Sequence, residues 1–291
     1  MSVPPVARDV TPGSPSPHRG RGVSLGDRLG EAGVVAATTV AATFLLLPVV
    51  ALLARAILGG ALDSILSARI VDALVLSLAT SSATVVLALA FGMPLALALA
   101  RRAFRGRSLL EVIVDLPIVL PPAVAGLALL LVFGRRGLLG GALESVGIVI
   151  PFTVVAVVLA QTFVAAPLFV RAARAGFAGV EREVEDAARA DGAGEVGVFR
   201  HVTAPLASGA LAAGLVMTWA RALGEFGATI MFAGAIQGRT ETLPVAVYAE
   251  FQVSLDDSIA AGAILVVVAF AVLAVVRLGH WRSAFDLGRL R

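Results

Sequence analysis

Residues 181–205 read EREVEDAARADGAGEVGVFRHVTAP and form the longest polar interruption between two hydrophobic blocks in the second half of the chain. The blocks on either side are apolar enough to lie in lipid. The charged side chains of the interruption need water, because moving an unpaired charge out of water is strongly unfavourable. We therefore predict a membrane protein whose 181–205 segment stands in water and contacts a soluble partner.

The composition of the whole chain agrees with this interpretation and excludes several functions. Of the 291 residues, 58% are hydrophobic and 15% are charged, whereas about 25% are charged in an ordinary soluble domain. All 23 basic residues are arginine, so the chain lacks the lysine that a nucleotide-binding P-loop needs. The arginines form no basic face, and we expect no nucleic-acid partner. Cysteine is absent and the three histidines lie in the tail or at membrane edges, so we expect no metal site and no catalytic residue.

Six stretches are long enough to cross a bilayer, which takes about 20 apolar residues in a helix. They predict an all-α polytopic membrane protein with six transmembrane helices in a domain at 31–280. A segment at 1–30, rich in Pro, Ser, Gly and Arg, is expected to be a disordered cytoplasmic tail, and 281–291 a cytoplasmic C-terminal end. The six stretches are Gly33–Ala54, Ala73–Ala100, Val112–Phe133, Gly147–Val170, Ala204–Ile236 and Ser258–Val276.

Arginine is distributed unevenly between the two sides of these stretches. The tail, the loop after the second stretch, the 171–203 loop and the C-terminal end together hold 17 arginines, and the opposite loops hold five. Cytoplasmic loops carry the excess of positive charge. We therefore expect both termini and the 171–203 loop to be cytoplasmic, with the chain in the plasma membrane of a prokaryote.

The central loop has a helical pattern of its own. Gly192 is expected to end a first short helix, and Pro205 suits the first turn of the next membrane helix. The segment then forms a helix–Gly–helix hairpin, unless it is simply a solvated connection. The apolar positions of the first helix recur every three or four residues: Phe177, Val180, Val184, Ala187 and Ala188.

The order of residues in this loop resembles the EAA motif of permeases of ATP-binding cassette (ABC) importers. That motif has an acidic residue, two alanines, a glycine, an aliphatic residue and a closing Leu-Pro. This chain has Asp186, Val202 and Ala204 where the family usually has glutamate, isoleucine and leucine. The expected coupling residues are Glu185, Asp186, Ala187, Ala188, Gly192, Val202 and Pro205.

The resemblance implies a type I importer architecture in which this loop is a coupling helix. In the family, the coupling helix docks in a cleft on a separate ATPase subunit, and closure of two such subunits moves the pore between inward-facing and outward-facing states. ATP and Mg²⁺ are then expected on the partner subunits and no cofactor on this chain, which agrees with the absence of a P-loop lysine.

Polar residues inside the predicted membrane helices are candidates for a translocation pathway. Arg221 and Glu225 lie four residues apart, close enough to pair on one helix face, and either line a pathway for an anion or orient the helix. Prolines break the third helix beside a pathway or as a packing kink. Polar residues of the fourth helix face the cavity or bond across helices. The candidates are Arg221, Glu225, Thr229, Asp115, Pro121, Pro122, Gln161 and Thr162.

Three segments sharpen the resemblance: LPIVLPPAVAGLALL at 116–130, AQTFVAAPLFVRAARAGF at 160–177 and RALGEFGATIMFAGAIQGRTETLPVAVY at 221–248. They closely resemble the molybdate-transporter permeases; sulfate and thiosulfate permeases are similar but less close. The resemblance implies a homodimeric pore in the bilayer, two ATP-binding cassette subunits and an extracytoplasmic binding protein that delivers a tetrahedral dianion.

Two alternatives remain open at this point. The same machine could carry sulfate, thiosulfate or tungstate. An ion-coupled secondary transporter would need no ATPase, and Asp115 and Glu225 could then carry protons. Residues 238–244 are interpreted as an ordinary solvated turn in preference to an outer gate or docking surface.

Overall fold

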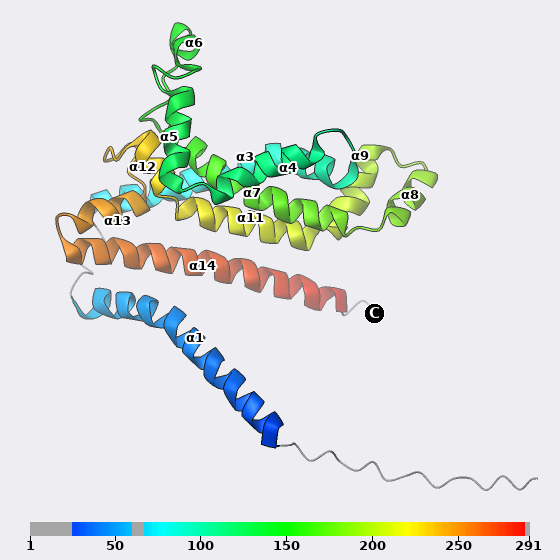
Figure 1. Cartoon of the computed structure of the whole chain (residues 1–291), viewed down its shortest axis with the longest axis horizontal. Coiled ribbons are helices and arrows are strands. Elements are labelled where there is room, and N and C mark those ends of the chain that lie inside the picture. The colour runs from blue at the N-terminus through cyan, green and yellow to red at the C-terminus, as the bar shows by residue number, and fades with distance from the viewer. Residues whose placement is uncertain (1–24, 60–66, 289–291) are drawn as a thin grey trace, which may run out of the picture. The chain divides into compact units, whose positions relative to one another are not determined.

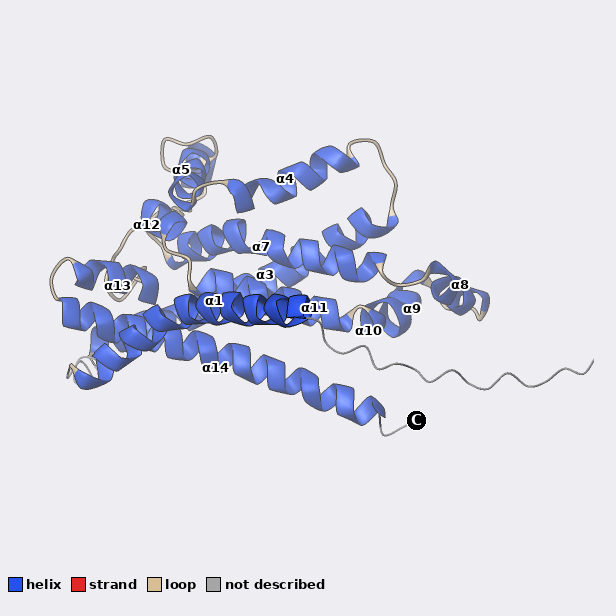
Figure 2. Cartoon of the chain, turned by 60° about the horizontal axis from the view of Figure 1, so that its bottom comes forward, coloured by secondary structure: helices blue, strands red, loops and turns tan. Residues whose placement is uncertain are grey.

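The computed structural model describes residues 25–59 and 67–288, and its side chains at 31–59 and 67–274. Every regular element in the described part is helical (Figure 2), which confirms the all-α class. Among these residues, four helices are long and apolar enough to cross a membrane, and two bent helix pairs raise the number to as many as six. The chain divides into two units at Val50 and Ala51, which are described separately.

The first unit holds most of α1 (Leu25–Leu58), which contains the first predicted stretch. Its side chains are exposed and largely apolar, as on Phe44, which is 76% exposed. A helix without polar faces is suited to lipid. The predicted tail at 1–30 falls largely outside the described residues, and α1 begins at Leu25, inside the range assigned to that tail.

The core of the second unit is formed by α3 (Ala68–Arg101), α7 (Val154–Ala178) and α11 (Ser208–Leu223), which pack on one another. Small residues allow the close approach: a side chain at Gly92 would meet the Phe169 ring, and one at Gly214 would meet Ala172. Membrane helices pack through such small residues because lipid supplies no hydrophobic force between them. The three helices run side by side in Figure 1.

The third predicted stretch is two helices, α4 (Arg107–Val119) and α5 (Pro122–Phe133), bent by 117°. Pro121 and Pro122 provide no backbone N–H, and the last hydrogen bond of the first segment runs from Leu120 N to Leu116 O. The prediction of a proline break is confirmed. The two helices pass the length and composition test for a membrane span together, so the third stretch is a bent pair and not one straight helix. The short α6 (Gly140–Ser145) follows.

The fifth predicted stretch, 204–236, is also wrong as a single helix. It consists of α10 (Ala204–Leu206), α11 and α12 (Gly227–Ala233). The helical segment that ends at Leu206 meets α11 at 74°. Helix α11 ends at Leu223, and residues 224–226 are not helical. Apolar side chains on both sides of this break keep the average hydrophobicity high, so the sequence predicts one continuous helix.

The fourth predicted stretch is shifted along the chain. Helix α7 begins at Val154, with the Thr153 hydroxyl capping its first turn, and extends to Ala178. Arg171 therefore lies on a core helix rather than in the 171–203 loop. The sixth stretch lies within α14 (Leu255–Gly288), which follows α13 (Leu243–Phe251).

Candidate functional site

The predicted helix–Gly–helix hairpin is present as α8 (Arg182–Ala190) and α9 (Glu195–Val198). Gly192 has φ of +91°, and the amide of Ala193 donates to the carbonyl of Ala188 at 3.0 Å. This left-handed position ends α8 and favours glycine. A π-helical turn, Phe199–Thr203, leads to α10. Figures 1 and 2 both show α8 projecting beyond the ends of α7 and α11.

Glu185, the first acid of the motif, faces inward. Its Oε1 accepts hydrogen bonds from Arg101 Nη2 at 2.8 Å and from Thr203 Oγ1 at 2.6 Å. Arg101 is the last residue of α3, and its Nη2 also donates to the Val180 carbonyl at 3.1 Å. The three side chains of Glu185, Arg101 and Thr203, which we call the latch, therefore tie the hairpin to the end of a core helix.

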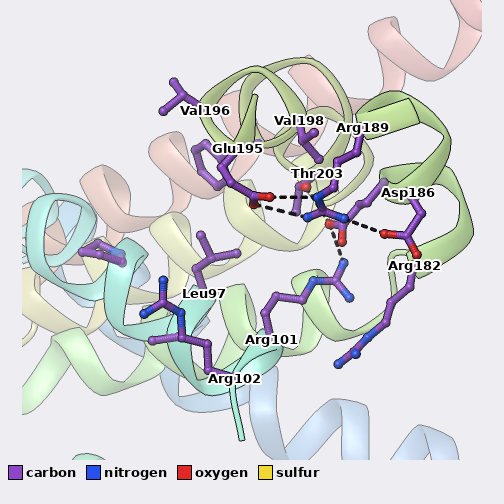
Figure 3. Close-up of a pocket in the computed structure, with 14 residues that line it drawn as sticks. Leu97, Arg101, Arg102, Arg182, Asp186, Arg189, Glu195, Val196, Val198 and Thr203 are labelled. Atoms are coloured by element: carbon purple, nitrogen blue, oxygen red, sulfur yellow. Dashed lines mark hydrogen bonds and ion pairs between the residues drawn. The ribbon is translucent and has the colours of Figure 1, made fainter. Parts of the chain in front are cut away.

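The second acid, Asp186, faces outward in a surface cluster. Arg189 donates to Asp186 Oδ1 and to Glu195 Oε1, both at 2.8 Å, and so links α8 to α9 (Figure 3). The bond from Arg189 holds the pKa of Glu195 below its ordinary value, and both acids raise the pKa of Arg189. Asp186 is 71% exposed, so this cluster adds little to stability.

A pocket of about 690 Å³ lies between the hairpin and the C-terminal end of α3. Arg101, Arg102 and Arg182 line it together with the acids of α8 and α9 (Figure 3). Pro94 and Leu97 contribute apolar surface. The hairpin is therefore in contact with α3 around a charged opening, and the latch connects the two elements.

The other predicted coupling positions are distributed over both faces of the hairpin. Ala187 and Pro205 are exposed, while Ala188 and Val202 are half-buried. The expected apolar face is divided: Phe177 and Val180 are buried, whereas Val184 is 43% exposed. Val196, which the motif does not include, is 79% exposed. The hairpin thus presents exposed apolar side chains beside the charged cluster.

Arg221 and Glu225 form an ion pair, with 2.6 Å between Nη1 and Oε2. They do not share a helix face as predicted, because Glu225 lies in the break after α11. Its other oxygen accepts from the Ala228 amide at 2.8 Å and so caps α12. Glu225 is 1% exposed, and Arg221 is 33% exposed at the side chain. The pair and the α12 cap together hold Glu225 in the break, and the Arg221 side chain stays partly exposed.

The broken helices α5 and α12 touch at their breaks. A Cβ at Gly227 would lie 2.7 Å from the Pro122 side chain, and one at Gly126 would lie 2.6 Å from the Ala228 carbonyl. Thr229, in the first turn of α12, is fully buried, and its hydroxyl has no hydrogen-bond partner among the described residues. Pro121 precedes α5 as its N-cap.

Asp115 lies on α4 and pairs with Arg171 of α7, with 3.2 Å between Oδ1 and Nε. One turn away, Glu111 pairs with Arg174 at 3.2 Å and with Arg107 at 2.9 Å. The α4–α7 contact is therefore held by a row of ion pairs. Asp115 belongs to this row between α4 and α7, whereas the Arg221–Glu225 pair lies at the break between α11 and α12.

Gln161 and Thr162 bond across helices, which was one of the two predicted alternatives. Thr84 of α3 donates to Gln161 Oε1 at 3.2 Å and accepts from Thr162 Oγ1 at 3.5 Å. Thr84 belongs to a buried polar row on α3 with Ser77, Thr80 and Ser81. The structure pairs Arg221 with Glu225 and connects Gln161 and Thr162 through Thr84. It does not bring all eight pathway candidates together.

A second ion cluster joins the N-terminal end of α3 to α13. Arg69 donates to Glu241 at 2.6 and 3.0 Å and also bonds Glu250. The expected solvated turn at 238–244 is wrong for its second half, because Thr240 and Leu243 are fully buried. The partners are 172 residues apart, so no local pattern indicated them. Among the described residues, no group of three acidic, His or Cys side chains is placed to hold a metal.

Comparison with known proteins extends these observations. The family model for "Binding-protein-dependent transport system inner membrane component" matches residues 88–279. The chain is 41% identical over 219 residues to the molybdenum transport system permease protein ModB of Escherichia coli K12, covering 75% of this chain and 95% of that one. It is 44% identical over 201 residues to ModB of Mycobacterium tuberculosis, covering 69% and 76%.

A third relative is the "Probable transport system permease protein NifC" of Clostridium pasteurianum, 41% identical over 170 residues, where the match covers 58% of this chain and 59% of the relative. Among solved structures, a bacterial ABC transporter involved in alginate import matches with a TM-score of 0.69 and 16% identity over 88% of this chain and 96% of that one. The MetNI methionine ABC transporter matches with a TM-score of 0.55 and 19% identity over 72% and 95%. These two likenesses concern the fold alone.

Proposed function

Because the chain belongs to the family of binding-protein-dependent transport system inner membrane components, we propose that it is the pore subunit of an ATP-driven importer for molybdate. It is a multi-pass inner membrane protein with an ABC importer permease fold. The observation that carries the substrate assignment is the 41% identity to a molybdenum permease over 95% of that protein's length. Similarity at this level, over 75% of this chain and 95% of the relative, favours the same transported ion over a related one.

The hairpin is the proposed docking element for a cytoplasmic ATPase subunit, which supplies the ATP and Mg²⁺ chemistry. Its exposed apolar residues, Val184 and Val196, flank the charged cluster around Arg189. An apolar centre with a polar rim is the usual composition of a protein interface. The latch then passes displacement of the hairpin to α3, because the Glu185–Arg101 bond is charge-assisted and mostly buried.

Two copies of the chain, two ATPase subunits and an extracytoplasmic binding protein complete the proposed assembly. Arg221 is the pathway residue best suited to an anion. Its side chain is partly exposed although it lies at a helix break, and Glu225 holds it in place. Thr229, which follows in α12, has a buried hydroxyl without a hydrogen-bond partner among the described residues. The other pathway candidates act in this proposal as structural contacts between helices.

The test begins with the binding protein and ends with transport. Radiolabelled molybdate, tungstate and sulfate are titrated into the partner binding protein, and uptake is measured in proteoliposomes that contain permease, ATPase and binding protein. We expect molybdate to be preferred and uptake to require ATP. A preference for sulfate overturns the substrate assignment, and uptake without any ATPase subunit supports an ion-coupled carrier instead.

A further inference from the structure

A second pocket, of about 620 Å³, opens at the N-terminal end of α7. Thr153, which caps α7, lines it, while the coupling hairpin begins just after the C-terminal end of the same helix. A helix of 25 residues spans about 37 Å at 1.5 Å per residue. The pocket and the hairpin therefore lie at opposite membrane faces. We call the first the outer pocket.

Two arginines from different loops line the outer pocket. Arg135 follows α5, and Arg239 follows α12. Both are exposed, and neither forms an ion pair with a described residue. Arg69 differs from these two arginines, because its guanidinium bonds two glutamates.

The rest of the lining is uncharged. Leu130, Val149, Pro151 and Phe152 supply apolar wall, and no acid is among the lining residues. Two like charges that share a pocket with low-dielectric walls repel each other and concentrate the field for an anion. The positive end of the α7 dipole points to the same place and adds to this field. The outer pocket thus carries a formal charge of about +2 with no internal counter-ion.

The wall that carries these groups is held in an unusual conformation. Phe152 has φ of +60°, and its ring lies where a side chain on Gly234 would be, within 3.0 Å of the position of a Cβ. A bulky residue in this region is strained, and such strain persists where surrounding structure enforces it, often at ligand sites. The Phe152 amide also approaches the Phe232 carbonyl at 3.5 Å, which ties the wall to α12.

We propose that the outer pocket receives the transported tetrahedral oxyanion as it leaves the binding protein, with Arg135 and Arg239 as its ligands. This inference rests on the proposed function and adds a binding site on the permease itself. The pocket is several times larger than one oxyanion, so the ion is held partly through water. A loose, two-arginine site suits brief capture before the pore, since tight binding would retain the ion.

The experiment uses the intact permease–ATPase complex in lipid nanodiscs, without binding protein, and measures equilibrium binding of radiolabelled molybdate. We compare the wild type, Arg135→Gln/Arg239→Gln, and the matched control Arg136→Gln. Arg136 is the exposed neighbour of Arg135 and does not line the pocket. We expect about a tenfold loss of affinity for each pocket arginine removed, and wild-type binding by the control. None of the three residues forms an ion pair with a described residue, so folding is expected to be unchanged.

Two results overturn the inference. One is unchanged molybdate binding by the double variant. The other is an equal loss in the Arg136 control, which indicates only general surface charge. Affinity for the loaded binding protein is measured on the same variants, and a loss confined to that affinity assigns the pocket to protein docking instead. Uptake by the wild type, reconstituted with its binding protein, tests the proposed function separately, and the binding measurement is repeated with radiolabelled sulfate. If the wild type binds and imports sulfate but not molybdate, the substrate assignment fails, while a loss of sulfate binding in the double variant still locates the anion site.

Discussion

Replacing Glu185 by alanine removes the carboxylate of the latch. The Glu185 side chain is 6% exposed and that of Arg101 is 16% exposed. The variant leaves a mostly buried guanidinium, which keeps the Val180 carbonyl as a partner. Breaking a buried ion pair in this way costs about 3 kcal/mol, and we use the lower end of the range because Arg101 retains some contact with water. At about 1.4 kcal/mol per tenfold change, local detachment of the hairpin becomes on the order of 100-fold more frequent.

Amide hydrogen exchange of residues 182–198, measured on the assembled transporter in nanodiscs, reports this detachment. We expect protection of the hairpin to fall by about two orders of magnitude while the core helices α3 and α7 keep theirs, because local opening does not require global unfolding. The ratio of molybdate imported to ATP hydrolysed is expected to fall in parallel, since a detached hairpin no longer moves α3.

The matched control is Asp186→Ala at the neighbouring acid. Its carboxylate is 71% exposed and bonds only a surface arginine, so we expect a change of about 0.5 kcal/mol or less. Removing both charges with Glu185→Met/Arg101→Met should restore much of the protection, because no buried charge is left unpaired. The reasoning is refuted if Glu185→Ala leaves exchange unchanged, or if Asp186→Ala loosens the hairpin equally.

Three further predictions concern other parts of the structure. Gly192→Ala forces a side chain into a left-handed conformation and should destabilise the hairpin by about 1–2 kcal/mol, whereas Gly194→Ala, at φ of −70°, should be close to neutral in the same exchange assay. The depressed pKa of Glu195 means that its bond to Arg189 is fully present above pH 4.5 and is lost as the pH falls through the lower folded-state pKa. The protection factor of residues 182–198, which corrects for the pH dependence of the intrinsic exchange rate, should therefore be constant from pH 8 to pH 5 and fall below pH 4.5, and Glu195→Gln should abolish that acid limb. Glu225→Gln keeps an acceptor for the α12 cap and loses the ion pair, whereas Glu225→Ala loses both. The alanine variant should therefore be less stable than the glutamine variant by about 1 kcal/mol and melt at a lower temperature in a thermal shift assay. Equal melting temperatures of the two variants would contradict the capping role.

Sequence reasoning succeeds where a single local feature determines the structure. The hairpin is predictable because Gly192 supplies the left-handed position that ends α8. The break before α5 is predictable because Pro121 and Pro122 remove backbone donors. The break after α11 escapes notice, since the apolar residues around Glu225 preserve the hydrophobic average over the window.

The orientation of individual polar side chains could not be predicted for a physical reason. Glu185 turns inward because Arg101, 84 residues earlier, supplies a buried donor. The sequence thus predicts the hairpin, which the structure confirms, but not the inward orientation of the first acid of the motif. In the same way, Glu241 is buried because of Arg69, so a segment that reads as a solvated turn packs in the interior. Pairing over such separations leaves no periodic signal.

The Arg69 cluster also has a consequence for biosynthesis. Arg69 is translated 172 residues before Glu241, which at 5–20 residues per second is a delay of roughly 10 to 35 seconds. Throughout that interval a charged residue at the end of a membrane helix lacks the carboxylates that later surround it. If α3 is inserted during this interval, the end of the helix that carries Arg69 has to remain in contact with water or lipid headgroups until α13 emerges. A ribosome stalled before residue 241 would hold a chain in which Arg69 has neither Glu241 nor Glu250 as a partner.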